Sequence, residues 1–195
     1  MNDIKKEFDK VHTPVELLKF MSKYINYGYL GKSGRVYRYD DSDFNDKWFN
    51  EYILESEDDI LQTGFGNCWD QVELERYWFL RNGYQIKTIY EMVKLDYDNL
   101  YPTHAFLVFK DHDGNWNWFE NSDFNNRGIH EFSSVDELLN YQYKKYVEFL
   151  KTFNIRDEEI ENIILTEFDK PLSHISALEY LDFVTDAKKI LVSSK

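Results

Sequence analysis

The chain has 195 residues, of which 43% are hydrophobic and 18% aromatic, and its formal net charge is −13. Because so much aromatic area must be buried, the composition predicts a folded core and disfavours disorder. A negatively charged surface repels phosphate backbones, so nucleic acid is not expected as a partner. A basic protein partner or an amine substrate is compatible with this charge. One cysteine excludes an intramolecular disulfide. The lack of an apolar signal core after Met1, or of a membrane-length apolar run, predicts a cytoplasmic protein with no membrane partner.

Hydrophobic spacing and turn residues predict helices first, then strands, then helices again. Thr13 and Glu16 form a capping-box pattern around Pro14, so a helix is expected to begin there. The elements expected in chain order are a helix over 13–27, a loop over 32–46 with a short strand at 35–39, a short helix or turn at 48–54, a helical turn at 56–61, a helix over 68–82, a strand over 85–94, a polar loop over 95–103, strands over 104–110, 115–121 and 127–132, a helix over 134–152, an ambiguous segment over 158–168, and a helix over 177–184.

This order indicates an α+β fold with a mostly antiparallel sheet. The helix over 68–82 is apolar around most of its circumference, so we expect it to be the buried central helix. Residues 1–195 are interpreted as a single domain. Within it we expect a catalytic-like core over about 48–132. Extra helices are expected at both ends of this core, as the N-terminal helix 13–27 and a C-terminal helical extension over 134–195.

Cys68 is the only cysteine, and it stands just before the predicted central helix. A thiol in the first turn of a helix feels the positive end of the helix dipole, which favours the nucleophilic thiolate. His104 opens an apolar strand, and the next strand ends in Glu120-Asn121-Ser122-Asp123. A thiol, an imidazole and a carboxylate in this order supply a nucleophile, a base and an orienting group.

The hairpin register decides which carboxylate can meet the imidazole. If Asp111 to Asn115 closes a three-residue loop, with Gly114 in the left-handed conformation, residue 106 faces Glu120 and His104 becomes its diagonal neighbour. A slip by one residue would turn Glu120 to the other face of the sheet. Asp123 or Asn121 would then take its place, so these two residues are the alternatives.

Three further residues complete the predicted site. Gln62 lies six residues before Cys68, and its amide could join the Cys68 backbone N–H in stabilising an oxyanion. Trp69 and Trp118 are candidate walls of the substrate cleft, although both are also expected as core residues. Each residue alone has an ordinary structural interpretation, and it is their joint order and spacing that points to catalysis.

The sequence Gly66-Asn67-Cys68-Trp69 resembles the Gly-x-Cys-Trp of papain-like cysteine peptidases, with Gln62 standing where their oxyanion glutamine stands. The strand opened by His104, and Glu120 at the end of an aromatic strand, are closer to bacterial transglutaminase-like proteins. The resemblance covers residues 60–125. It implies a papain-like or transglutaminase-like core with thiol acyl chemistry on an amide or ester.

That chemistry covers peptide or small amide hydrolysis, deamidation and acyl transfer, and it needs no cofactor. The resemblance departs at residue 120, where transglutaminases carry aspartate and papain-like peptidases asparagine.

Two other interpretations remain open at the level of sequence. In the first, the same fold has lost its activity and binds a protein partner, as an adaptor or immunity protein does. In the second, Cys68, His104, His112 or His130 bind a metal with carboxylates. The cysteine–histidine spacing matches no common zinc pattern, and His112 stands on a predicted turn, so no metal site is expected.

Overall fold

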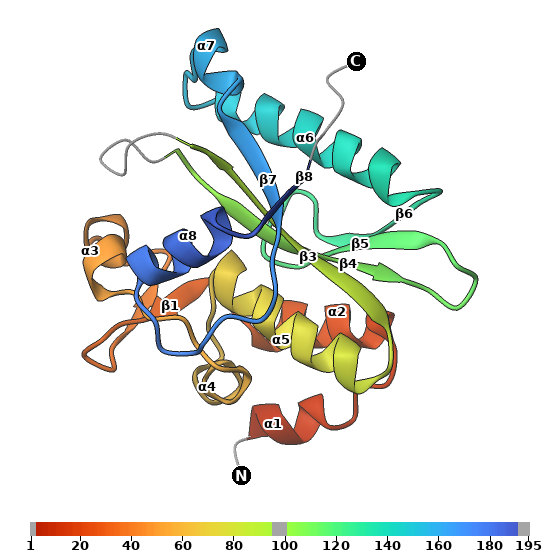
Figure 1. Ribbon diagram of the computed structural model, residues 1–195. Coiled ribbons are helices and arrows are strands. Elements are labelled where there is room, and N and C mark those ends of the chain that lie inside the picture. The colour runs from red at the N-terminus through yellow and green to blue at the C-terminus, as the bar shows by residue number, and fades with distance from the viewer. Residues whose placement is uncertain (1–2, 95–100, 191–195) are drawn as a thin grey trace.

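The computed structural model describes residues 3–94 and 101–190, and within them helices surround a six-stranded sheet (Figure 1). The strands lie in the order β6-β5-β4-β3-β7-β8, and every neighbouring pair is antiparallel. Their bounds are Gln85–Val93 (β3), His104–Lys110 (β4), Trp116–Glu120 (β5), Gly128–Phe132 (β6), Ile163–Glu167 (β7) and Lys188–Ile190 (β8). The prediction of an α+β fold with an antiparallel sheet is therefore confirmed.

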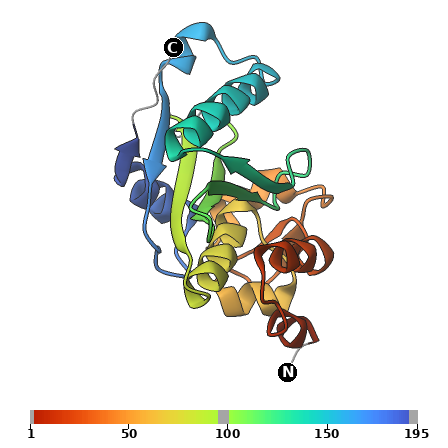
Figure 2. The same ribbon diagram turned by 90° about the vertical axis from the view of Figure 1, so that its right-hand side faces the viewer.

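Two long helices cover opposite faces of this sheet. Helix α5 (Cys68–Arg81) packs against β3 and β4, whereas α6 (Val135–Lys151) lies across β5 and β6 on the other face (Figures 1 and 2). Most of α5 is buried, including charged side chains such as Arg76, which pairs with Glu73 at 3.0 Å. A helix covered on nearly every side must pair its charges internally.

Strand β4 serves both faces because its side chains alternate. Leu107 and Phe109 enter the core that contains α5, whereas Phe106 and Val108 enter a second core with Leu138 of α6. The strand is buried on both sides, which explains why its sequence is a continuous apolar run. His104 stands at its first position, where the sheet ends.

The smaller elements precede or follow this core. Their bounds are Asp3–Phe8 (α1), Pro14–Tyr24 (α2), Gly28–Leu30 (β1), Val36–Arg38 (β2), Phe44–Glu51 (α3), Glu57–Thr63 (α4), Asp157–Ile160 (α7) and Ala177–Thr185 (α8). Thr13 caps α2 with the predicted capping box, in which Glu16 is the reciprocal acceptor. Strands β1 and β2 form a separate antiparallel pair.

The β4–β5 hairpin has the predicted register. The Asp111 N–H donates to the Asn115 carbonyl at 2.9 Å, and Leu107 faces Phe119. Gly114 adopts a φ of 91°, which glycine tolerates better than any other residue. The register prediction is therefore confirmed, and it places His104 and Glu120 on the same face of the sheet.

The N-terminal helix is shorter than predicted. Helix α2 ends at Tyr24, because Ile25 is already extended and Asn26 forms a parallel bridge with Phe65 in the loop before α5. The following residues enter strand β1, which the sequence did not indicate. A contact between distant segments thus decides where the helix ends.

The C-terminal extension over 134–195 is only partly helical, which corrects the prediction of a helical extension. The ambiguous segment 158–168 divides into the short helix α7 and the strand β7, and β7 pairs with β3 inside the sheet. Strand β8 follows α8 and pairs with β7. The C-terminal part therefore completes the sheet, because without it β3 would be an open edge. Residues 95–100 of the predicted polar loop, and residues 191–195, lie outside the described part.

Within the residues that the structure describes, no helix combines the length and the apolar character that crossing a bilayer requires.

Candidate active site

Cys68 is the first residue of α5, and a capping box fixes the turn before it. The Asn67 side-chain oxygen accepts hydrogen bonds from the backbone N–H groups of Trp69 (2.8 Å) and Asp70 (3.3 Å). In return, the Asp70 carboxyl group accepts from the Asn67 N–H at 2.9 Å. The thiol therefore lies at the positive end of the helix dipole, as the sequence predicted.

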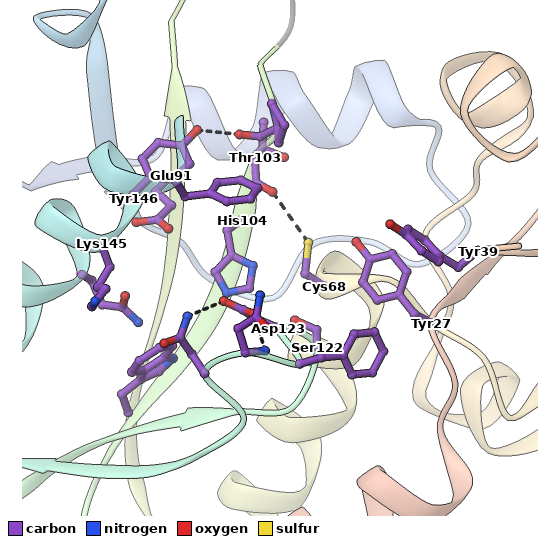
Figure 3. Close-up of a pocket in the computed structure, with 17 residues that line it drawn as sticks. Tyr27, Tyr39, Cys68, Glu91, Thr103, His104, Ser122, Asp123, Lys145 and Tyr146 are labelled. Carbon is purple, nitrogen blue, oxygen red and sulfur yellow. Dashed lines mark hydrogen bonds between the residues drawn. The ribbon is translucent and has the colours of Figure 1, made fainter. Parts of the chain in front are cut away.

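Cys68 lines a pocket of about 370 Å³ to which α5, β3, β4 and α6 all contribute (Figure 3). Only 7% of the Cys68 surface is exposed, so a reagent must reach the sulfur through this pocket. Most of the wall is aromatic or titratable. The lining side chains that matter below are Tyr27, Tyr39, Glu91, His104, Trp118 and Asp123.

His104 and Glu120 form the closest polar contact beside the thiol. The His104 Nε2 lies 2.8 Å from the Glu120 Oε2, and Glu120 is only 2% exposed. The other carboxylate oxygen of Glu120 accepts hydrogen bonds from the Ser122 hydroxyl (3.0 Å) and the Asp123 N–H (2.8 Å). Three hydrogen bonds thus fix the carboxylate and, through it, the ring. The nitrogen left to face the pocket is Nδ1, and Cys68 lines the same pocket, with its Sγ 4.0 Å from the Thr103 carbonyl oxygen (Figure 3).

The surroundings of His104 favour its charged form. Burial opposes protonation, but the negative charge of Glu120 and the hydrogen bonds with Cys68 and Glu120 outweigh it, and the pKa of His104 lies well above its ordinary value. A protonated imidazole next to a thiol stabilises the thiolate. The thiol therefore shares its pocket with an imidazolium that Glu120 holds in place.

The two alternatives to Glu120 are placed differently. Asn121 is 1% exposed and donates to the Gln71 Oε1 at 2.7 Å, so its amide belongs to the packing of α5. Asp123 lines the pocket, but its carboxylate accepts hydrogen bonds from the turn that follows it. It is Glu120 that the structure brings to His104, because the hairpin register makes them diagonal neighbours.

The oxyanion role predicted for Gln62 must be corrected. Helix α4 continues to Thr63 and ends at Gly64, whose φ is 72°, so Gln62 lies within a helix and not on the turn before the thiol. Its side chain is exposed and does not line the pocket. A residue in this position cannot donate to an oxyanion formed at Cys68.

The structure places the two tryptophans predicted as cleft walls differently. Trp118 lines the pocket, as predicted for a cleft wall. Trp69 does not, because it is 1% exposed and stacks on Tyr180 with ring centroids 4.4 Å apart. Its indole N–H donates to the Thr103 hydroxyl at 3.2 Å. Trp69 is therefore a core residue that holds the backbone next to His104.

Tyr27 is a pocket residue that sequence reasoning missed. It lines the pocket together with Cys68, whose thiol and backbone N–H both influence the pKa of the Tyr27 hydroxyl. Figure 3 shows the Tyr27 ring and the His104 imidazole on either side of Cys68. Burial, followed by the proximity of Cys68, raises the pKa of Tyr27 well above its ordinary value, so the hydroxyl keeps its proton.

The segment that carries Tyr27 is joined to the loop before the thiol. The Asn26 N–H donates to the Gly64 carbonyl at 2.8 Å, and the Gly66 N–H donates to the Asn26 carbonyl at 3.1 Å. The next residue, Gly28, is approached so closely that a Cβ there would lie 2.6 Å from the Tyr37 carbonyl oxygen. Gly28 is therefore the local sequence feature that marks how closely this segment approaches its neighbours.

Glu91 adds a second carboxyl group to the pocket. It faces His104 across the β3–β4 pair and is 3% exposed. Burial raises the pKa of Glu91 to about 8, although the charge of His104 opposes this. Glu91 is therefore mostly protonated at neutral pH, and Glu120 is the carboxylate that balances the imidazolium.

Among residues 3–94 and 101–190, no group of three or more histidine, cysteine, aspartate or glutamate side chains is arranged to hold a metal ion. His112 lies against Tyr84 on the hairpin turn, and the His130 Nε2 donates to the Asn126 carbonyl at 2.8 Å. The histidines considered for a metal site are thus dispersed.

No family model matches the sequence of this chain, and no curated protein matches it.

Proposed function

We propose that this protein is a cysteine-dependent acyl-transfer enzyme, in which Cys68 is the nucleophile, His104 the general base and acid, and Glu120 the orienting carboxylate. One observation carries the proposal: Cys68 of α5 and His104 of β4 line one pocket, and the His104 Nε2 lies 2.8 Å from the Oε2 of Glu120, a buried residue of β5. This is the arrangement that thiol catalysis requires.

The reaction follows from the positions of these groups. The Cys68 thiolate attacks a carbonyl carbon, a C–S bond forms, and the carbonyl π electrons move to the oxygen. When the tetrahedral intermediate collapses, the bond to the leaving group breaks, and the leaving amine or alcohol takes the proton from His104. His104 then removes a proton from water, or from an amine, which attacks the acyl-thioester and releases Cys68.

The proposed substrate is an amide or ester of a peptide, a protein or a small molecule. The aromatic wall of the pocket supports an organic acyl group, and a net charge of −13 favours basic over acidic partners. The position of Cys68 at the start of a helix that packs on an antiparallel sheet supports a papain-like or transglutaminase-like core.

Alkylation tests the activated thiol directly. Wild-type protein should react with iodoacetamide at about pH 6, where an ordinary thiol is mostly protonated and reacts slowly, and Cys68→Ala should not react. The measurement is the rate of mass gain in intact-protein mass spectrometry, with free cysteine as the reference. Labelling no faster than free cysteine would contradict the proposal.

One observation favours a different function, that of an inactive binding module. Tyr39 is 68% and Phe124 61% exposed at the mouth of the pocket, whereas Cys68 is only 7% exposed. Exposed aromatic side chains of this kind are typical of protein-binding surfaces. An unreactive thiol, together with saturable binding of a basic peptide that Tyr39→Ala and Phe124→Ala abolish, would support this alternative.

A further inference from the structure

Thiol acyl transfer needs a hydrogen-bond donor for the oxyanion, and the residue predicted for this task, Gln62, lies outside the pocket. The Cys68 backbone N–H alone is a single donor. A second donor must reach the space above the thiol from another segment. Tyr27 is the side chain that the structure places there, because it lines the same pocket as Cys68 and lies on the opposite side of the thiol from His104 (Figure 3).

The hydroxyl is suited to this task. A tyrosine hydroxyl has one proton to donate and two lone pairs that accept. The hydroxyl proton is free to point toward the thiol or toward an atom bound to it. The Cys68 N–H belongs to the first turn of α5, where the positive end of the helix dipole lies, and it is the other donor to the oxyanion.

We propose that Tyr27 is a catalytic residue of the acyl-transfer site, whose hydroxyl donates a hydrogen bond to the oxyanion formed when Cys68 attacks a carbonyl group. This inference rests on the function proposed above. Before attack the hydroxyl proton faces the thiolate. As the C–S bond forms, negative charge leaves the sulfur and appears on the carbonyl oxygen, and the hydroxyl hydrogen bond turns with it. No proton is transferred, and Tyr27 is unchanged when the intermediate collapses.

Tyr27 reaches the pocket from a different part of the chain than the other groups of the proposed site. It comes from the segment between α2 and β1, whereas the other reacting groups come from α5, β4 and β5. The bridge between Asn26 and Phe65 holds this segment against the loop that leads to Cys68. Its ring also packs on Tyr39, with centroids 5.8 Å apart, and on Phe124 at 6.4 Å. The donor is therefore fixed before a substrate binds, which is what oxyanion stabilisation requires.

Two reactions of the same thiol separate this role from a structural one. Alkylation by iodoacetamide displaces iodide and forms no oxyanion, whereas acylation by p-nitrophenyl acetate passes through a tetrahedral oxyanion and releases p-nitrophenolate. Both rates are measured for wild type and Tyr27→Phe, at a pH where alkylation has reached its plateau. The phenylalanine keeps the ring and removes only the hydroxyl.

We expect Tyr27→Phe to acylate about 100-fold more slowly than wild type, as for the loss of one oxyanion donor, while its plateau alkylation rate changes by less than about 3-fold. Tyr141→Phe, which removes a hydroxyl outside the pocket, is the matched control and should change neither rate. Thermal melting of each variant checks that it is folded.

The outcomes distinguish the two proposals. Equal acylation rates in Tyr27→Phe and wild type would overturn the role of Tyr27 and leave the acyl-transfer function in place. Acylation and plateau alkylation that fall together would also overturn it, because Tyr27 would then act on the thiol alone. A wild-type protein that neither alkylates rapidly nor acylates would refute the proposed function itself.

Discussion

Two groups of buried acidic side chains flank the first turn of α5, and they differ in the partners that they contact. On the pocket side, Glu120 stands 2.8 Å from His104, whose imidazole is held in its charged form. On the other side, Asp70 and Glu55 lie together, and the donors to Asp70 are uncharged. There burial raises the pKa of Asp70 to about 7 and that of Glu55 to about 9.

The two groups differ in what lies against the carboxyl oxygens. Asp70 accepts hydrogen bonds from the Tyr52 hydroxyl (2.8 Å) and from two backbone N–H groups, yet these do not offset its desolvation. Glu120 also accepts hydrogen bonds from a hydroxyl and a backbone N–H, and in addition it contacts an imidazolium. Uncharged donors alone therefore leave the pKa of a buried carboxyl group raised, as at Asp70.

The largest effect is expected when the charge beside His104 is removed. Glu120→Gln keeps the shape of the side chain but loses the charge that raises the pKa of His104, and its amide NH₂ can select the wrong imidazole tautomer. We expect the acylation rate to fall roughly 10²- to 10⁴-fold. The alkylation profile should move to higher pH. Burst kinetics with p-nitrophenyl acetate measure the first effect, with the exposed Glu131→Gln as the control.

The next effect concerns Asp70 on the opposite side. Asp70→Asn must point an NH₂ group at the Tyr52 hydroxyl or at a backbone N–H, so one buried donor loses its acceptor. We expect a loss of about 2–4 kcal/mol in the free energy of unfolding. Urea denaturation at pH 7 measures it, and the exposed Asp40→Asn is the matched control. Equal stability of Asp70→Asn and wild type would contradict the buried network.

A smaller effect is expected for the pH dependence of stability, to which Glu55 contributes. Because the pKa of Glu55 is raised to about 9 in the folded protein, the folded state binds more protons than the unfolded state between about pH 4.5 and 9. Stability must then fall as the pH rises through this range. Glu55→Gln cannot ionise, so its melting temperature should fall less between pH 6 and 9, by roughly 2–8 °C. Parallel curves for the two proteins would refute the assignment.

The smallest effect is expected for Ser122, which donates to the Glu120 Oε1 at 3.0 Å. The Asp123 N–H donates to the same oxygen at 2.8 Å and remains in Ser122→Ala. We therefore expect the acylation rate to fall only about 5-fold or less, which corresponds to one partly redundant hydrogen bond. A loss as large as that of Glu120→Gln would mean that the carboxylate depends on this single hydroxyl.

Local sequence signals predicted the parts of the site that lie near each other in the chain. The hairpin between Asp111 and Asn115 fixed the register, and the register selected Glu120 over Asp123. The start of α5 at Cys68 followed from turn residues and helical spacing. These are short-range effects, in which a loop length or a cap determines where side chains point.

The missed features all depend on contacts between distant segments. Tyr27 reaches Cys68 because Asn26 pairs with Phe65. Strand β7 joins the sheet because it pairs with β3, which lies far from it in the sequence. Gln62 was misplaced because its spacing from Cys68 matched a family pattern, whereas α4 continues through it. Local pattern does not report which remote strand or loop will supply a partner.

The chain order of the pocket residues has a consequence for the synthesis of the protein. Tyr27 and Cys68 leave the ribosome early, but His104, Glu120 and the α6 side of the pocket follow them, and β7, which flanks β3 in the sheet, emerges later still. A nascent chain therefore carries Cys68 before it carries the residues that surround the sulfur in the folded protein. The pocket is complete only when these later segments have docked onto α5 and the bridge between Asn26 and Phe65.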